Sequence, residues 1–123
     1  MSSKLRRFEI LLPLQFNDGR EVSPELLAEA VLEIVERFDA ASYETQKVEG
    51  YWRYQGVLYR DNLVKIVIDA ADEEANREWT RMYKKCWKQK LEQLDLWLDS
   101  YTVDVDKCKK SMSLKQLSIA FAD

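Results

Sequence analysis

The sequence predicts a two-layer α+β sandwich, with a four-stranded antiparallel sheet and two helices on one of its faces. Two observations lead to this fold class. Strand-like and helix-like patterns follow one another in the order β-α-β-β-α-β, and the connections between them are short. This is the ferredoxin-like order. The 123 residues suit one domain, so we expect a domain over residues 1–105 and a C-terminal tail over residues 106–123 that packs on the domain or on a partner.

The first strand and the first helix have clear sequence signals. Apolar side chains alternate from Phe8 to Phe16, and Pro13 predicts a bulge or an early strand end because it cannot donate to a ladder. Ser23 followed by Pro24 predicts an N-cap and the first helical position. One apolar stripe at helical spacing then predicts a helix over residues 24–38.

The middle of the chain predicts a hairpin with a two-residue turn at residues 55–56, which would pair Trp52 with Tyr59. This register conflicts with the residues that follow. It places Leu63 and Lys65 on the face of Trp52, whereas the more apolar set is Val64, Ile66 and Ile68. A bulge or loop at residues 61–62 would resolve the conflict.

A second helix is predicted next, capped by Asp69 or Asp72. We expect Trp52 and Trp79 to be largely buried and Trp87 to be more exposed. The expected buried stripe of the helix comprises Ala75, Trp79, Met82, Tyr83 and Cys86. Alternation over residues 94–98 predicts a fourth strand that extends to residue 105.

The composition excludes several chemistries. The chain has no histidine, which excludes histidine acid–base catalysis and histidine ligation of metals. Its two cysteines, Cys86 and Cys108, have no metal-site or disulfide spacing. The net charge of −3 and the absence of a long apolar run favour a cytoplasmic protein with no nucleic-acid or membrane partner. We expect neither a metal nor another cofactor.

Several short motifs resemble those of a small bacterial family of uncharacterised ferredoxin-like domains. They are the turn-and-cap string at residues 18–23, Gly50-Tyr51-Trp52-Arg53 followed by Gly56, Arg60-Asp61, and the apolar strand over residues 64–68. The similarity spans residues 7–99 and does not cover the tail. The resemblance implies the same fold and assigns no catalytic residue.

Four aromatic side chains are the candidate ligand-binding residues, namely Trp52, Tyr51, Tyr59 and Trp97. Gly50 two positions before Trp52 could allow a ligand to approach a stacking face, although a bulge glycine beside a core tryptophan is the simpler interpretation. A catalytic site would have to use carboxylates and tyrosines near the outer sheet face, such as Glu49, Tyr51, Asp95 and Asp99. No spacing singles out a pair of them.

The outer face of the sheet is predicted to be apolar. If Leu12, Ile66 and Leu96 point toward the helices, alternation sends four apolar residues outward, namely Leu11, Leu63, Val67 and Trp97. A patch of this size is normally covered, either by a second copy of the chain or by the tail.

These patterns favour a non-catalytic interaction or small-ligand-binding module that acts as a homodimer through the sheet face. The alternative is a small carboxylate- or tyrosine-dependent enzyme of the dimeric α/β-barrel kind. A pocket with convergent polar groups would favour the enzyme.

Overall fold

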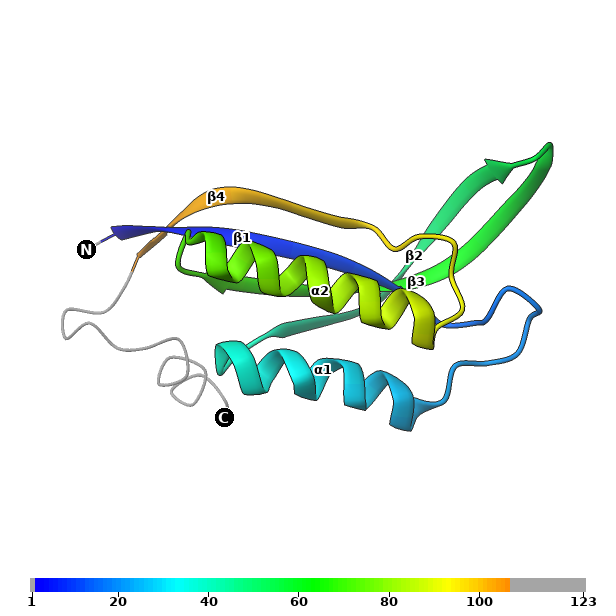
Figure 1. Ribbon diagram of the computed structural model, residues 1–123, viewed down its shortest axis with the longest axis horizontal. Helices are drawn as coiled ribbons and strands as arrows, with labels where there is room; N and C mark the ends of the chain where they lie inside the picture. The colour runs from blue at the N-terminus through cyan, green and yellow to red at the C-terminus, as the bar shows by residue number, and fades with distance from the viewer. Residues whose placement is uncertain (1, 107–123) are drawn as a thin grey trace.

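The computed structural model describes residues 2–106, which form a four-stranded sheet and two helices (Figure 1). The elements are β1 (Ser2–Pro13), α1 (Pro24–Phe38), β2 (Ser42–Tyr54), β3 (Val57–Ala70), α2 (Glu74–Lys90) and β4 (Leu98–Asp106). The strand order is β2-β3-β1-β4, and all neighbouring strands are antiparallel. The predicted α+β class is therefore confirmed. Of the predicted tail, Asp106 is the last residue of β4, and residues 107–123 lie outside the described residues.

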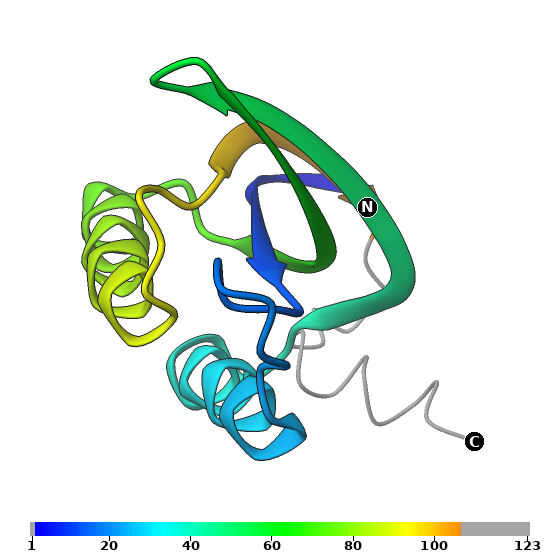
Figure 2. The ribbon, with the colours of Figure 1, turned by 90° about the vertical axis from the view of Figure 1, so that its right-hand side faces the viewer.

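Both helices lie on one face of a strongly curved sheet, and within residues 2–106 the other face carries no helix (Figures 1 and 2). Between the two layers lies the core, to which β1 contributes Phe8, Ile10 and Leu12. The predicted inward residues Leu12, Ile66 and Leu96 are all buried there. Among residues 2–106, no helix is long and apolar enough to cross a membrane.

Helix α1 has the predicted bounds. The Ser23 hydroxyl accepts a hydrogen bond from the Leu26 amide at 3.1 Å, so it satisfies one of the free N–H groups of the first turn. Asp39 ends the helix in a left-handed conformation, with φ of 67°.

Helix α2 is rotated about its axis relative to the prediction. Its buried residues are Asn76, Thr80, Tyr83 and Trp87, whereas Cys86 is exposed. Trp87 is 0% exposed, and both Trp79 and Trp52 are only partly buried, so the predicted ranking of the tryptophans is wrong. The true stripe begins with two polar residues whose side chains hydrogen-bond locally, which hides it from a hydrophobicity pattern.

The start of α2 also differs from the prediction. Glu73 occupies the N-cap position and makes no side-chain cap hydrogen bond. The two predicted caps are instead paired with arginines of β1: Asp69 accepts two hydrogen bonds from Arg7, and Asp72 pairs with Arg6 at 2.7 Å. The Arg6–Asp72 pair ties the segment before α2 to the sheet, whereas the Arg7–Asp69 pair joins β1 to β3.

The bounds of the outer strands are shifted. β1 begins at Ser2 rather than at Phe8, and it ends at Pro13, as the missing proline donor predicts. β4 begins at Leu98, later than predicted, so residues 91–97 form a connecting loop after α2.

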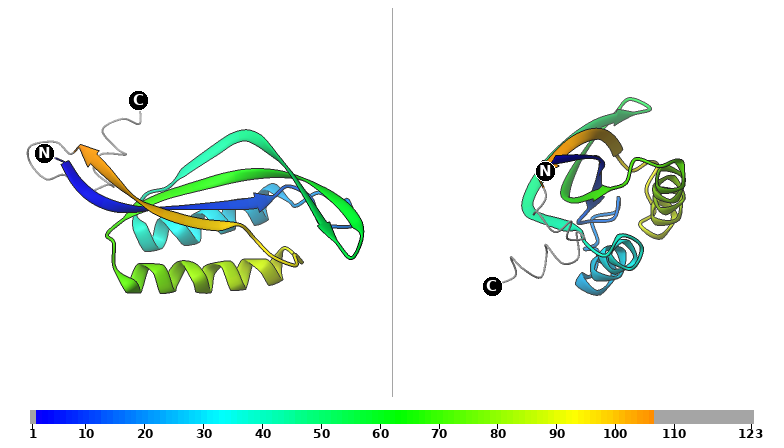
Figure 3. Two further views of the ribbon diagram at one scale, coloured as in Figure 1. Left: turned by 90° about the horizontal axis from the view of Figure 1, so that it is seen from above. Right: turned by 90° about the vertical axis from the view of Figure 1, so that its left-hand side faces the viewer.

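The β2–β3 hairpin extends beyond the rest of the sheet (Figures 1 and 3). Its turn is the predicted one, with positive φ at Gln55 and Gly56, and Trp52 pairs with Tyr59. The predicted bulge at residues 61–62 is wrong, because β3 pairs regularly there and the register shift lies in β2 between Glu44 and Val48. No bulge is required at residues 61–62, since Trp52 lies on the outer face rather than in the core.

Candidate functional site

A pocket of about 280 Å³ lies on the outer face of the sheet, where the hairpin leaves it. Three parts of the chain form it. The end of β1 and the hairpin provide Leu11, Pro13 and Leu63, and the loop after α2 provides Leu94 and Leu96. Since β1 pairs with β3 only as far as Leu63, the hairpin beyond this residue is free to form one wall. We call this site the outer-face pocket.

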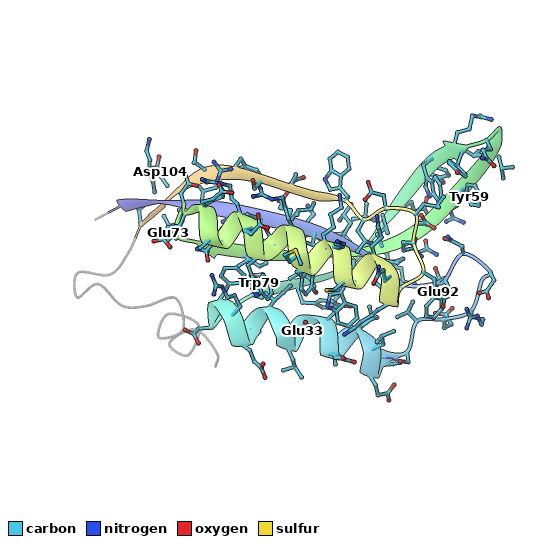
Figure 4. The ribbon with its side chains drawn as sticks, in the orientation of Figure 1. Glu33, Tyr59, Glu73, Trp79, Glu92 and Asp104 are labelled. Atoms are coloured by element: carbon cyan, nitrogen blue, oxygen red, sulfur yellow. The ribbon has the colours of Figure 1, made fainter. Side chains whose placement is uncertain are left out.

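The aromatic wall of the outer-face pocket is held in place by two contacts. The ring of Trp52 stacks on Tyr59, with centroids 4.4 Å apart and an interplanar angle of 15°. Its indole N–H donates to Asp61 Oδ2 at 2.6 Å. Trp52 and Asp61 both line the pocket, while Tyr59 supports Trp52 from the hairpin, away from both helices (Figure 4). The indole plane is therefore fixed before a ligand arrives.

Trp97 forms the other aromatic wall, in the loop that precedes β4. Its ring is 62% exposed, and its indole N–H donates to Asp99 Oδ2 at 2.7 Å. The amide of Leu11 donates to the Trp97 carbonyl at 3.1 Å, which fastens this loop to β1. Two tryptophans from distant parts of the chain thus line one pocket.

The polar lining of the outer-face pocket is acidic. It comprises Asp61, Gln93 and Asp95, and no lysine or arginine among residues 2–106 lines it. Asp95 is paired with Lys84 at 3.0 Å, and this hydrogen bond lowers the pKa of the Asp95 carboxyl. Within residues 2–106, no ion pair involves Asp61. Asp61 is therefore the uncompensated charge of the pocket.

A second cluster of polar side chains lies beyond Trp97 on the same sheet face. Tyr101 donates its hydroxyl to Glu9 Oε2 at 3.0 Å, and Lys65 approaches the same oxygen at 3.9 Å. Asp99 stands opposite Glu9 across the β1–β4 pair. Its Oδ1 is buried without a hydrogen-bond partner among the described residues. These residues do not line the outer-face pocket.

The structure separates the predicted site residues. Trp52 and Trp97 line the outer-face pocket, and Tyr59 supports it. Tyr51 is 60% exposed on the opposite face of the hairpin, where it donates to Glu49 at 3.0 Å. Glu49 pairs there with Arg60, whose hydrogen bond lowers the pKa of the glutamate. Tyr51 and Glu49 are thus outside the candidate site.

The sequence analysis missed Asp61 as a site residue and placed a bulge there instead. The missed signal was the hairpin register, which already put Asp61 two positions from Tyr59 on the face of Trp52. Gly50, opposite Asp61, is not a pocket residue. A Cβ there would lie 3.0 Å from the Leu63 side chain, so the glycine makes room for the pocket floor.

The predicted apolar patch on the outer face contributes to this pocket. Leu11, Leu63 and Trp97 line it, whereas Val67 lies further along β3. Among the residues that the structure describes, no group of three or more cysteines and carboxylates could hold a metal ion.

The outer-face pocket suits a flat, cationic ligand. Tryptophan faces stack on planar rings and attract cations through the negative face of the ring. A carboxylate without a counter-ion favours positive charge nearby. The volume is close to the lower end of the usual range for small-molecule sites, roughly 300–1,000 Å³. Fold and site together define an α+β sandwich with an aromatic, acidic pocket on its open sheet face.

Comparison with solved structures adds two proteins of similar fold. A phage SAM (S-adenosylmethionine) lyase in complex with S-methyl-5′-thioadenosine superposes with a TM-score of 0.62 at 17% identity, covering 85% of this chain and 93% of that one. A phage SAM lyase in the apo state gives a TM-score of 0.60 at 17% identity, covering 86% and 94%. No protein-family model and no curated protein sequence matches the chain.

At this level of identity, the similarity establishes a shared fold. It also corrects the functional prediction. The preference for a non-catalytic module of unknown function is wrong, because the two similar solved structures are of a phage SAM lyase. The alternative of a small enzyme is the better supported reading. The resemblance to an uncharacterised bacterial family stays a prediction.

Proposed function

We propose that this chain is a SAM-cleaving lyase that releases S-methyl-5′-thioadenosine, with the outer-face pocket as its active site. The observation that carries the proposal is the likeness to two phage SAM lyase structures over more than four-fifths of the chain. The pocket supports it independently, because its lining matches the chemistry of SAM better than that of an anionic or purely apolar ligand.

SAM combines a planar adenine, a ribose and a sulfonium cation that joins the nucleoside to a methionine chain. Adenine would stack on the indole of Trp52 or Trp97, as bases do on aromatic side chains. The sulfonium would lie near Asp61, the uncompensated carboxylate of the pocket. An anionic ligand such as a nucleotide would meet Asp61 and Asp95 without a basic partner in the lining.

The proposed reaction breaks the bond between the sulfonium sulfur and Cγ of the methionine chain. Sulfur keeps the electron pair and becomes the neutral thioether of S-methyl-5′-thioadenosine. A lyase adds no water, so the four-carbon fragment must form a new bond within itself. Either its carboxylate oxygen attacks Cγ and closes a lactone, or a carboxylate base takes a proton from Cβ and a double bond forms between Cβ and Cγ. Both routes balance, and the product distinguishes them.

The absence of histidine is compatible with the lactone route, because the substrate's own carboxylate is the nucleophile and no protein base is needed. The protein's part is to hold the chain in a geometry from which this attack occurs. Such positioning alone can supply a large share of a rate enhancement, in favourable cases about 7–11 kcal/mol. The fixed plane of Trp52, stacked on Tyr59, is suited to this role.

The test is to incubate the purified protein with SAM and to measure S-methyl-5′-thioadenosine and the four-carbon product by chromatography and mass spectrometry. Trp52→Ala should reduce kcat/KM by at least about tenfold, since it removes one stacking wall. The matched control is Tyr51→Ala, which changes the neighbouring residue on the opposite hairpin face and should leave kcat/KM unchanged. Absence of S-methyl-5′-thioadenosine with the wild-type protein would refute the proposal.

We also propose that the sandwich belongs to the ferredoxin-like class. Two observations support this assignment. The element order is β-α-β-β-α-β, and the strand order read from the opposite edge is β4-β1-β3-β2 with β1 and β3 in the centre. In that arrangement the outer-face pocket lies on the sheet face opposite the two helices.

A further inference from the structure

We infer that Asp61 is a specificity residue that selects the cationic sulfonium of the substrate over the neutral thioether of the product. The inference rests on the proposed function and assigns a particular role to one residue of the same pocket. The two aspartates of the pocket differ in charge compensation, because Asp95 is paired with Lys84 and Asp61 is in no ion pair within residues 2–106.

Asp61 is held in place yet keeps its charge available. Its Oδ2 accepts the indole N–H of Trp52 at 2.6 Å, so the carboxylate is fixed beside the aromatic wall. This donor is neutral and leaves the negative charge in place. Arg60, the cation next in sequence, points to the other face of the hairpin and pairs with Glu49 at 2.5 Å. The side chain of Asp61 is partly buried, which reduces screening of its field by water.

Asp95 provides a contrast within the same pocket. Its carboxylate is 72% exposed and pairs with Lys84 at 3.0 Å, so its charge is largely offset before a ligand binds. The two aspartates therefore predict different behaviour. Removal of the charge at position 61 should reduce the preference for a cation, whereas removal at position 95 would also leave Lys84 without its ion-pair partner.

The role of Asp61 follows from how charge changes during the reaction. The sulfonium carries a full positive charge in the bound substrate, and this charge fades as the carbon–sulfur bond breaks. A carboxylate beside the sulfur therefore stabilises the bound substrate at least as much as the transition state. Interactions of this kind affect KM and leave kcat unchanged or even restrain it. The same carboxylate loses its attraction for the product, which favours release of S-methyl-5′-thioadenosine.

The test uses two ligands that cannot be cleaved and that differ in charge at the sulfur position. Sinefungin carries an ammonium group there, and S-adenosylhomocysteine carries a neutral thioether. Isothermal titration calorimetry with the wild-type protein should give about tenfold tighter binding of sinefungin, since tenfold corresponds to a single modest charge interaction. Asp61→Asn keeps an acceptor for Trp52, and it should bring the affinity ratio close to one without weakening S-adenosylhomocysteine. The control Glu49→Gln removes a carboxylate on the opposite face of the hairpin, outside the outer-face pocket, and should keep the wild-type ratio.

Kinetics provide the second readout. Asp61→Asn should raise KM for SAM about tenfold and leave kcat unchanged or higher, a pattern that a merely structural role would not give. Equal wild-type affinities, or a ratio that persists in Asp61→Asn, would overturn the inference even if SAM is cleaved. A ratio that depends on Asp61 in a protein that does not cleave SAM would refute the proposed function and support the charge selection. Binding of neither ligand would overturn both.

Discussion

Trp87 in α2 provides the sharpest test of the packing between the two helices. Its side chain is 0% exposed, and its indole N–H donates to Glu33 Oε2 at 2.9 Å across the helix seam. The ammonium group of Lys90 lies 4.5 Å from the centre of its ring and pairs with Glu33 at 3.8 Å. Replacement by alanine would remove the largest fully buried side chain and one partner of a charged acceptor.

The loss of unfolding free energy in Trp87→Ala has two causes, namely the cavity that the tryptophan leaves and the lost hydrogen bond to Glu33. Truncation of a buried tryptophan to alanine typically costs about 3–5 kcal/mol, against a total stability of about 5–15 kcal/mol for a domain. Trp87→Phe separates the two contributions, because it keeps most of the volume and loses the bond to Glu33. We expect it to cost about 1–3 kcal/mol. Trp79→Ala should cost less than Trp87→Ala, since Trp79 is only partly buried beside Phe38.

Urea titrations followed by far-UV circular dichroism measure these free energies without relying on tryptophan fluorescence. The slope of the unfolding free energy against urea concentration must stay constant for the comparison to hold. Trp97→Ala is the matched control, because this tryptophan is 62% exposed on the sheet face and should cost under about 1 kcal/mol. The reasoning would be refuted if Trp79→Ala destabilised the protein as much as Trp87→Ala.

Three further predictions concern charge, the hairpin turn and assembly. Hydrogen bonds from Arg6, Arg81 and Lys84 lower the pKa values of Asp72, Glu74 and Asp95 below the ordinary 3.8 for Asp and 4.5 for Glu. The stability that these three ion pairs contribute is present above the ordinary pKa values and is lost as pH falls through the lower folded values. The urea midpoint should therefore stay constant from pH 7 to 5 and fall below about pH 4, less steeply in 1 M salt. A midpoint that rises on acidification would contradict this prediction. Gln55 has a positive φ of 50°, so Gln55→Asn should raise the urea midpoint and Gln55→Val should lower it, the reverse order being evidence against the turn. We also propose that a second copy of the chain covers the outer sheet face around Val67, beside the outer-face pocket, and leaves the pocket open. Sedimentation equilibrium should show a dimer that Val67→Glu dissociates. A wild-type monomer would contradict this proposal and leave the C-terminal tail as the predicted cover.

Local signals in the sequence were sufficient to predict α1 and the hairpin turn. A cap such as Ser23 and a turn at Gln55-Gly56 act through the backbone of adjacent residues, so tertiary context does not override them. The phase of α2 depends instead on packing against α1. Its buried stripe contains Asn76, which accepts a hydrogen bond from Arg37 of α1 and donates to the Ala71 carbonyl. A pattern based on hydrophobicity cannot identify a polar residue whose burial depends on hydrogen bonds, one of them to an arginine 39 positions away.

The outer-face pocket illustrates a different limit. The sequence showed a conflict of register around Trp52, and the assumption that a tryptophan must be buried in the core led to a bulge at residues 61–62. The structure resolves the conflict without a bulge, since Trp52 is stabilised outside the core by Tyr59 and Asp61. A large aromatic residue in phase with charged rather than apolar neighbours indicates an outward ring. On a strand that extends beyond its sheet, such a ring has no second layer to cover it, so a ligand or a partner is the natural contact for its free face.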